Sequence, residues 1–287
     1  MTRHDEKSIT KTSLYDQEKW YTFCIEKLIG MKTPTCSVII HTHNEEKNIV
    51  ECISSAKLLT DNIIVIDMES TDETVSLAKN NGTQVFNFPF SHYVEPSREF
   101  GIKKANTTWV FLLDADERMT KELAEEIANK ISNFSSLISH FRVPRKNIFG
   151  RKKWLRHGGW WPDHQIRLIN TKYFKIWPKA IHSTPKIDGE IGYLKNPIKH
   201  YFHGDLERMV EKTIIFENIE SDLLFKANKP VGTVTFFRKF LGELYRRLFA
   251  NLGFLDGSFG IIESIYQAYS KTITYLYLYE KKNSRTL

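Results

Sequence analysis

Short apolar runs alternate with amphipathic segments through the first half of the chain. The runs have the length of buried strands and are rich in β-branched residues, and the segments between them carry apolar residues at helical spacing. The predicted strands are CSVII (36–40), IIVI (63–66), TQVFNF (83–88) and WVFLLD (109–114), and the predicted helices are 46–59, a segment capped by Ser70 or Thr71 that ends at Asn80, and 95–105. This alternation predicts right-handed βαβ units in an α/β fold with a mostly parallel central sheet flanked by helices.

Polar residues follow these strands at the points where the strands end. The carboxyl ends of parallel strands meet at one edge of a sheet, and ligands of such sheets bind beyond that edge. The residues at these ends are His43, Asn44, Glu45, Asp67, Asp114 and Asp116. The sequence therefore predicts a polar ligand site there.

The stretch LLDADER places three carboxylates, Asp114, Asp116 and Glu117, directly after an apolar strand. Such a cluster raises carboxylate pKa values unless a positive charge offsets it, and Mg²⁺ takes oxygen ligands of this kind. An alternative is that the acids favour the amino-terminus of the helix that KELAEEIANKI predicts from near Thr120. The spacing alone leaves both interpretations open.

Length and composition limit the class of protein. With 287 residues and 41% hydrophobic content, the chain can bury one sizeable α/β core with extensions. Cys24, Cys36 and Cys52 are odd in number and unpatterned, which predicts reduced core residues. The first 35 residues lack a continuous apolar core, and no apolar run reaches the roughly 18 residues of a membrane span. We therefore expect a cytoplasmic protein.

Positive charge is unevenly distributed along the chain. The net charge is +7, and residues 224–287 hold ten lysines and arginines against four acids. A second run, RVPRKNIFGRKKWLR (142–156), holds seven cations and no acid. Such surfaces suit phosphates of nucleotides, lipids or nucleic acid. Nucleic-acid binding would leave the acidic strand ends unexplained, so we predict no nucleic-acid partner.

Two phosphate-binding motifs are missing from the sequence. Neither GxxxxGK[ST] nor GxGxxG occurs, which argues against P-loop and dinucleotide-cofactor chemistry. The loop after the first strand, HTHNEEKN, is acidic and polar, whereas a nucleotidyltransferase has a glycine-rich, basic loop there.

Six motifs occur in order and together resemble a known family. They are SVIIHTHNEEKNI, IIVIDMESTDET, LLDADE, GGWWPDHQIRLI, HYFHGDLERMVEKT and GFLDGSFGI. The set resembles the inverting family-2 glycosyltransferases of the GT-A fold. The last three motifs are similar to the bacterial branch that builds lipopolysaccharide inner cores, including its β-1,4-glucosyltransferases. The resemblance runs from about Thr35 to Glu280; His41 and His43 depart from the residues that relatives often carry.

The resemblance implies a domain organisation. The expected parts are an N-terminal extension (1–33), partly disordered or one helix; a GT-A domain (34–215) with a nucleotide-sugar half (34–118) and an acceptor half (119–215); and a helical, basic C-terminal region (216–287).

The resemblance also implies site residues. Asp116 would hold Mg²⁺ or Mn²⁺, which stabilises charge on the leaving diphosphate. The implied donor-binding residues are Thr42, Asn44 and Glu45 in the nucleotide pocket, Asp67 at the base, Arg98 at the diphosphate and Asp114 near the ribose or the metal's waters. An alternative for Arg98 is a solvated helix charge. His182 is the predicted second metal ligand, and the roles of His200 and His203 stay open.

Inversion in one displacement needs a base that takes the proton of the acceptor hydroxyl. We expect Asp163 in this role, because the neighbouring Trp160 and Trp161 would stack on acceptor sugars and raise the pKa of the carboxyl by desolvation. The alternative is that both tryptophans are core residues and Asp163 lies in a turn. Arg167 is expected to pair with a phosphate or an acid group of the acceptor.

The expected activity is transfer of a sugar from a nucleotide sugar, UDP-glucose first, to a saccharide acceptor such as the lipid-linked lipopolysaccharide core. The alternative is a catalytically inactive or nucleotidyltransferase-like protein that binds sugar nucleotides.

The segment VTFFRKFLGELYRRLFANL (234–252) carries apolar residues at three- and four-residue steps beside basic ones, as in a helix lying at a bilayer surface. We therefore expect peripheral contact with the inner face of the cytoplasmic membrane. Alternatively, this helix covers the sheet or forms a homodimer contact.

Overall fold

The computed structural model describes residues 35–133, 137–202 and 206–283. The chain divides into two units, Met1–Thr35 and Cys36–Leu287, and the features that follow belong to the second. The predicted N-terminal extension, Cys24 and His203 lie outside the described residues.

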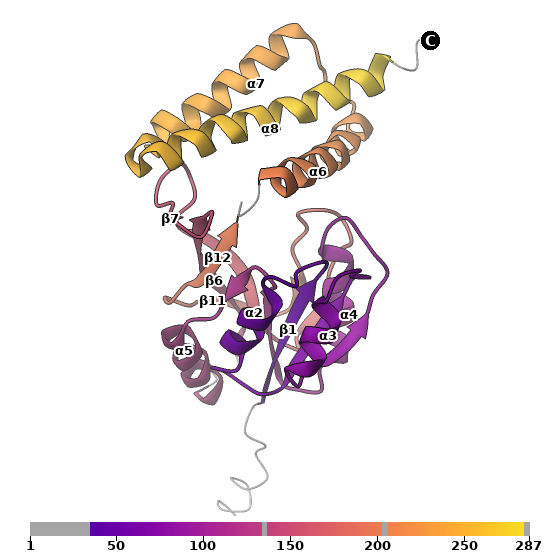
Figure 1. Cartoon of the computed structure of the whole chain (residues 1–287), viewed down its shortest axis with the longest axis vertical. Helices are drawn as coiled ribbons and strands as arrows, with labels where there is room; N and C mark the ends of the chain where they lie inside the picture. Colours follow the sequence, from indigo (N-terminus) through magenta and orange to yellow (C-terminus); the bar gives the residue numbers. More distant parts are fainter. Residues whose placement is uncertain (1–34, 134–136, 203–205, 284–287) are drawn as a thin grey trace, which may run out of the picture. The chain divides into compact units, whose positions relative to one another are not determined.

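A mixed ten-stranded sheet forms the centre of this unit (Figure 1). Its strands are β1 (Cys36–Thr42), β2 (Ile63–Asp67), β3 (Gln84–Asn87), β4 (Trp109–Asp114), β5 (Glu117–Arg118), β6 (Ile138–Phe149), β7 (Lys153–Trp154), β8 (Asp163–Asn170), β11 (Glu190–Tyr193) and β12 (Ile198–Phe202). The order is β3-β2-β1-β4-β8-β6-β12-β5, with β7 and β11 also paired to β6. β9 (Phe174–Ile176) and β10 (Lys186–Ile187) form a separate antiparallel pair. The predicted fold class is confirmed, since the first four strands in chain order are mutually parallel.

Strand direction brings functional side chains to one edge of the sheet. β8 runs antiparallel to β4 and β6, so its first residue, Asp163, lies at the edge where β4 ends. In the ladder, Arg145 of β6 is the partner of Asp163, and Asn147 is the partner of His200 on β12. This edge therefore carries residues from both halves of the sheet, including Asp114 at the end of β4.

Helices cover both faces of the parallel part of the sheet. They are α2 (Ile49–Ala56), α3 (Thr74–Asn80), α4 (Glu95–Lys104) and α5 (Lys121–Ser132). On β1, Val38 and Ile40 pack into a core cluster shared with α2, α3 and α5, whereas Ile39 packs into a second cluster with Ile102 of α4. Burial on both faces explains why β1 reads as a continuous apolar run.

Helix boundaries follow the sequence signals with one exception. Thr120 caps α5 as expected, because its hydroxyl accepts a hydrogen bond from the Leu123 amide. Neither Ser70 nor Thr71 caps α3, which begins only at Thr74. Both residues instead bind Asn44. The Ser70 hydroxyl accepts a hydrogen bond from the backbone amide of Asn44, and the backbone amide of Thr71 donates to the Asn44 side-chain oxygen.

The cysteine prediction is confirmed for the two that are described. Cys36 and Cys52 are buried and form no disulfide. Burial raises the pKa of the Cys36 thiol to about 12.

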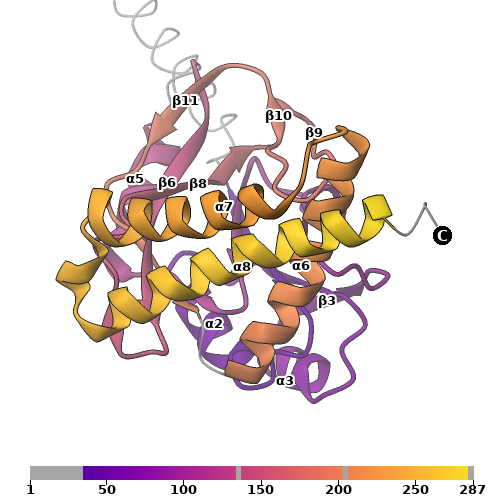
Figure 2. The same ribbon diagram turned by 90° about the horizontal axis from the view of Figure 1, so that it is seen from above.

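Helices of the C-terminal region pack on one another (Figures 1 and 2). They are α6 (Leu206–Lys226), α7 (Thr233–Tyr245), the π-turn Arg246–Ala250, the 3-10 turn Gly253–Asp256 and α8 (Ser258–Asn283). The buried Asp256 carboxylate accepts hydrogen bonds from the Arg156 and His157 amides, both at 2.8 Å, which fastens this region to the loop before β8. No helix within the described ranges has the length and hydropathy that crossing a bilayer requires.

Candidate active site

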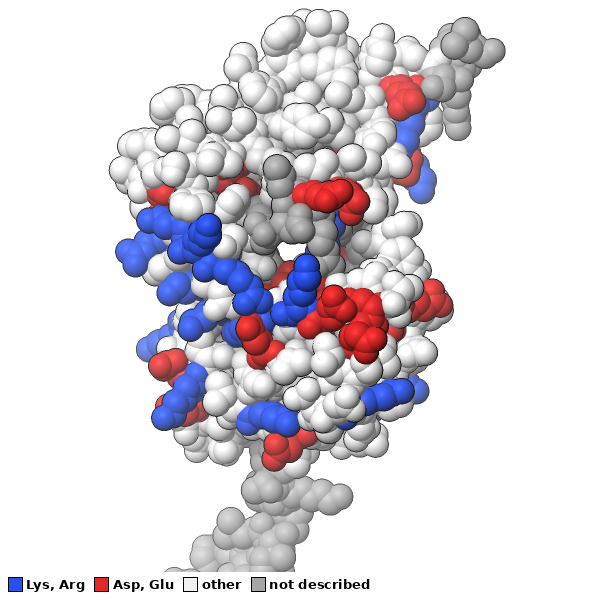
Figure 3. Space-filling model, in the orientation of Figure 1, with Lys and Arg blue, Asp and Glu red and all other residues white. Residues whose placement is uncertain are grey.

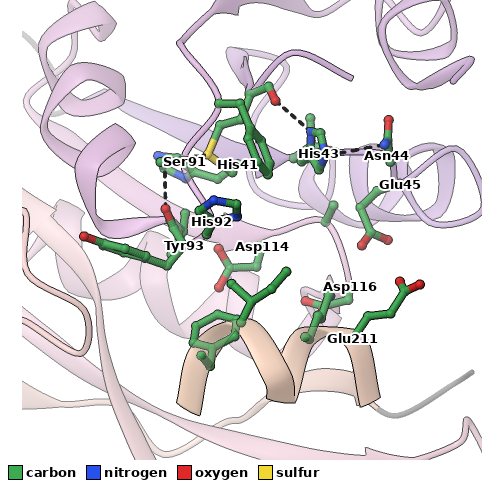
Figure 4. Close-up of a pocket in the computed structure, with 18 of the residues that line it drawn as sticks. His41, His43, Asn44, Glu45, Ser91, His92, Tyr93, Asp114, Asp116 and Glu211 are labelled. Carbon is green, nitrogen blue, oxygen red and sulfur yellow. Dashed lines mark hydrogen bonds between the residues drawn. The ribbon is translucent and has the colours of Figure 1, made fainter. Parts of the chain in front are cut away.

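A cavity of about 460 Å³ lies beyond the carboxyl ends of β1, β2 and β4. Figure 4 shows Glu45, Asp116 and Glu211 gathered on one side of it, with Asp114 nearer its centre. Its lining also includes Thr42, His43, Asn44, Phe90, His92, Tyr93, His200, Lys212 and Phe216. The predicted edge of the sheet therefore forms one wall, and α6 closes the cavity from the other side.

Asp114 is neutralised by two buried arginines. Arg98 and Arg167 each approach its carboxylate oxygens at 2.8 Å, and both side chains are 5% exposed. Burial alone would raise the pKa of Asp114, but Arg167 and Arg98 hold it well below its ordinary range. His41 lies behind this group, with its Nδ1 3.1 Å from Arg98. The solvated-charge alternative for Arg98 is therefore wrong.

Glu117 is also committed to protein partners. Its side chain is fully buried, with Arg167 at 2.6 Å and Arg145 at 3.6 Å from Oε1. Its Oε2 accepts a hydrogen bond from the Asp114 amide at 3.0 Å. The positive charge that the acidic cluster requires thus comes from arginines for Asp114 and Glu117, and Asp116 is the carboxylate that remains open.

Asp116 faces a histidine of β12, the strand that pairs with β5 directly after Asp116. His200 Nε2 lies 3.6 Å from the Asp116 carboxylate, whose side chain is 28% exposed. Burial would raise the pKa of Asp116, but His200, through its charge and a hydrogen bond, and Lys212 lower it. An oxygen and a nitrogen ligand thus face the same cavity.

Asn147 sets the orientation of His200. The Asn147 amide donates to Asp163 at 3.1 Å and to the Trp160 carbonyl at 3.2 Å, so its oxygen is left as the acceptor for His200 Nδ1 at 2.6 Å. The neutral imidazole in this tautomer would give up its hydrogen bond to Asp116 and leave the Nε2 lone pair for a cation beside that carboxylate. Metal-binding histidines are held in this way, so the donor set fits a divalent cation.

Unsatisfied polar atoms lie at the carboxyl ends of β1 and β2. Thr42 Oγ1 and Asp67 Oδ1 are buried and have no hydrogen-bond partner among the described residues. Asp67 Oδ2 accepts from the Ser70 amide, which fixes the carboxylate at the end of β2. The ring of His43 lies 4.4 Å from that of Phe90, whose side chain is 43% exposed. The cavity wall at these strand ends therefore combines Thr42 with the aromatic surface of His43 and Phe90.

A second cavity of about 380 Å³ meets the first at Asp114 and Val94. Its wall contains Arg98, Arg142, Arg145, His164, Gln165, Arg167, Trp177, His182 and Thr184, with Glu95. The two cavities thus share Asp114 but differ in the sign of the charges that line them.

Asp163 is held by three donors beside the second cavity. They are Arg145 Nε at 2.8 Å, Gln165 Nε2 at 2.7 Å and Asn147. Burial raises the pKa of Asp163, but Arg145 and the hydrogen bonds outweigh it and lower the pKa below its ordinary value. The expectation of a raised pKa was wrong, because charged and amide donors surround the carboxylate.

These strand ends fall within a matching family model. The family described as Glycosyl transferase family 2 matches residues 37–187, more than half of the chain. The chain belongs to glycosyltransferase family 2. An uncharacterized glycosyltransferase of Rickettsia conorii is 26% identical over 259 residues, covering 83% of this chain and 88% of that protein. The predicted enzyme class, a glycosyltransferase, is confirmed.

Solved structures of two enzymes are similar to this glycosyltransferase at low sequence identity. Glucosyl-3-phosphoglycerate synthase of Mycobacterium tuberculosis, in complex with Mn²⁺, UDP and glucosyl-3-phosphoglycerate, is 16% identical with a TM-score of 0.46, covering 70% of this chain and 83% of that one. TarS of S. aureus (residues 1–349), in complex with UDP, is 16% identical with a TM-score of 0.45, covering 87% and 92%.

The glycosyltransferase brings some predicted site residues together and separates others. Thr42, Asn44, Glu45, Asp114 and Asp116 line the first cavity, whereas Arg98, Arg167 and His182 line the second. Asp67, Asp163, Trp160 and Trp161 line neither. Trp160 packs against Phe202 with Arg247 over its ring, and Trp161 packs edge-on against Trp154.

Sequence reasoning left His200 unassigned and missed Asn147 and Arg145. His182 lies away from Asp116, in the second cavity, where its amide donates to Glu95. The HYFH motif did signal His200, but choosing among the histidines required the pairing of β12 with β6. Asn147 and Arg145 lie in the basic run, whose alternation with apolar residues was the available signal for a strand.

Proposed function

We propose that this glycosyltransferase moves a sugar from a UDP-sugar, UDP-glucose first, to a hydroxyl group of a saccharide acceptor with inversion. The observation that carries the proposal is the pairing of Asp116 with His200 at the cavity beyond the parallel strands. In this proposal Phe90 and His43 stack on the nucleoside base, and Asp67 and Thr42 accept its hydrogen bonds.

Asp116 and His200 would hold Mg²⁺ or Mn²⁺, which when bound supplies positive charge to the departing diphosphate. The described residues contain no group of three or more His, Cys, Asp or Glu side chains that could hold a metal. Two protein ligands are nevertheless sufficient where phosphate oxygens and water complete the coordination, as Mg²⁺ prefers. Lys212 also lines the cavity, and its positive charge acts on Asp116.

Asp163 accepts the proton of the acceptor hydroxyl in this mechanism. Its lowered pKa keeps it ionised at neutral pH, so it is ready to act as the base. Asn147 links Asp163 to His200, and Arg145 links it to Glu117. These contacts fix the base relative to the metal ligands, while Arg98 and Arg167 keep Asp114 ionised between the two cavities.

We further propose a lipid-linked acceptor, such as the lipopolysaccharide core, met at the inner membrane surface through α7. Its exposed stripe supports this, with Val234, Phe237, Leu241 and Tyr245 exposed by 80, 66, 56 and 65%. Figure 3 shows the face over α7 and α8 almost without charged residues, while lysines and arginines gather over the β6 and β7 side. The alternative occupant of this face is a second copy of the chain. In this proposal residues 34–215 form the GT-A catalytic domain, with 1–33 and 216–287 as extensions.

A screen of sugar nucleotides for hydrolysis without acceptor, in the presence of Mg²⁺, tests the proposal. We expect slow release of UDP from one donor and its loss in Asp116→Ala. A nucleotidyltransferase would exchange pyrophosphate instead. Binding of UDP-sugars without any hydrolysis or transfer would favour the inactive sugar-nucleotide-binding alternative.

A further inference from the structure

The second cavity contains an arginine that none of the described carboxylates neutralises. Four arginines line it, and three of them have carboxylate partners: Arg98 pairs with Asp114, Arg167 with Asp114 and Glu117, and Arg145 with Asp163. The Arg142 side chain makes no hydrogen bond or ion pair with any residue that the structure describes. Its Nε is buried and finds no hydrogen-bond partner within the described ranges.

The position of Arg142 follows from the geometry of β6. Phe141 and Val143 on either side of it belong to the core cluster, so the strand directs Arg142 to the opposite face and into the cavity wall. The β6–β8 register shifts between Phe141 and Arg142, as at a β-bulge. A buried, unpaired guanidinium nitrogen is costly, and an anionic ligand would offset that cost.

The carboxylates near the cavity do not serve as this anion. Asp114, Glu117 and Asp163 are each held by other arginines, as above. Glu95 also lines the cavity, where its Oε1 accepts a hydrogen bond from the His182 amide. His164 and His182 add imidazoles to the same wall. The cavity therefore suits a negative group that enters from solution.

We propose that the second cavity binds a carboxylate or phosphate group of the acceptor saccharide, with Arg142 as its principal contact. This inference rests on the proposed function, since it takes the other substrate, the nucleotide sugar, to occupy the first cavity. A donor diphosphate would need to lie beside Asp116 and His200, and neither residue lines the second cavity. The two cavities meet at Asp114, so an acceptor anchored at Arg142 extends toward the place where the sugar is transferred.

Calorimetry with methyl β-glucuronide, glucose 6-phosphate and the neutral methyl β-glucoside tests this inference, in protein saturated with UDP and Mg²⁺. We expect the anionic sugars to bind about 10-fold more tightly than the neutral one, as a charge-assisted hydrogen bond permits. Arg142→Gln should remove that preference. The matched control is Lys130→Gln, which removes one positive charge at an exposed site on α5 outside both cavities.

Three results would overturn the inference. They are equal binding of anionic and neutral sugars, including no binding of either; a preference that Arg142→Gln leaves intact; and anion binding to UDP-free protein that saturating UDP abolishes, which would identify the donor phosphates as the ligand. Failure of the proposed function is read separately, from the absence of UDP release in the hydrolysis screen. The anion preference is measured without turnover and does not depend on that screen.

Discussion

The two cavities that meet at Asp114 are built from opposite charges. The first carries open carboxylates and a histidine, with Asp116 28% exposed and His200 beside it. The second carries arginines, and the carboxylates that approach it are already paired. This difference shows that the three carboxylates after β4 have different roles. Buried arginines pair with Asp114 and Glu117, whereas Asp116 remains accessible to a ligand.

This division suits a displacement between two substrates. A diphosphate needs a cation that carboxylates hold, whereas an anionic acceptor needs a cation that the protein provides directly. Asp114 lies between them and remains ionised because of Arg98 and Arg167.

Replacing Arg167 should have the largest effect, on stability. Arg167→Gln leaves the buried Glu117 and Asp114 with one cation fewer, and breaking such a pair costs about 3–5 kcal/mol of unfolding free energy. Chemical denaturation measures it. The control is Lys175→Gln, whose exposed pair with Asp188 should contribute about 0–1 kcal/mol. A loss equal to that of the control would show that the arginine pairing does not stabilise the fold.

Arg167→Gln should also change how the free energy of unfolding depends on pH. The folded pKa of Asp114 is depressed, so its contribution to stability is present above the unfolded carboxyl pKa of about 4 and is lost as the pH falls further. Arg167→Gln raises that folded pKa, so the stability gap between variant and parent should narrow below about pH 4. A gap that stays constant down to pH 2 would assign the loss to packing.

Asp116→Ala tests whether the first cavity holds the proposed metal. Transfer should fall by about 100- to 1,000-fold, the usual span for losing electrostatic stabilisation of a developing charge. Calorimetry of UDP with and without EDTA supplies the second measurement, and we expect EDTA to weaken UDP binding to the parent but not to Asp116→Ala. Undiminished affinity of the parent in EDTA would remove the metal from the mechanism.

Asp163→Asn tests the proposed base, which lies beside the second cavity. We expect UDP affinity to persist while turnover falls by about 100-fold, as for loss of a general base. Because the pKa of Asp163 is lowered, the acid limb of kcat/KM that it causes should lie below about pH 4. Retained turnover with weakened UDP binding would make Asp163 a binding residue.

Short apolar and polar patterns in the sequence predicted the first, acidic cavity better than the second, basic cavity. The strands that end near Thr42, Asp67 and Asp114 are continuous apolar runs, so their carboxyl ends could be located within a residue or two. Parallel pairing then required those ends to meet. The chemistry of this cavity is therefore largely encoded in short segments of sequence.

The second cavity, and the position of His200 in the first, depend on pairing between distant segments. β6 is a strand whose cationic residues alternate with apolar ones, and its charge suggested only a phosphate-binding surface. His200 meets Asn147, 53 residues earlier, only through the β12–β6 register. A one-residue slip would have turned His200 to the other face, and no local pattern fixes that register.

The last prediction concerns how a lipid-linked acceptor reaches the second cavity. Phe237→Ser with Leu241→Ser should reduce flotation with anionic liposomes several-fold, because these side chains are 66 and 56% exposed on α7. Such exposed positions change stability by only about 0.5 kcal/mol or less. Replacing the basic residues Arg246 and Arg247 would be a less specific test of membrane contact. Both pair with Glu243, and Arg247 also donates a hydrogen bond to the Gly158 carbonyl and lies over the ring of Trp160.

The matched control is Leu58→Ser with Leu137→Ser, because these leucines are 51 and 63% exposed at sites outside the C-terminal helices. It should float like the parent. Equal flotation of both double variants, or no flotation of the parent on anionic vesicles, would argue against lipid contact. A shift from dimer to monomer in the α7 variant alone, measured by light scattering, would instead identify a second copy as the occupant, and the second cavity would then receive a soluble acceptor.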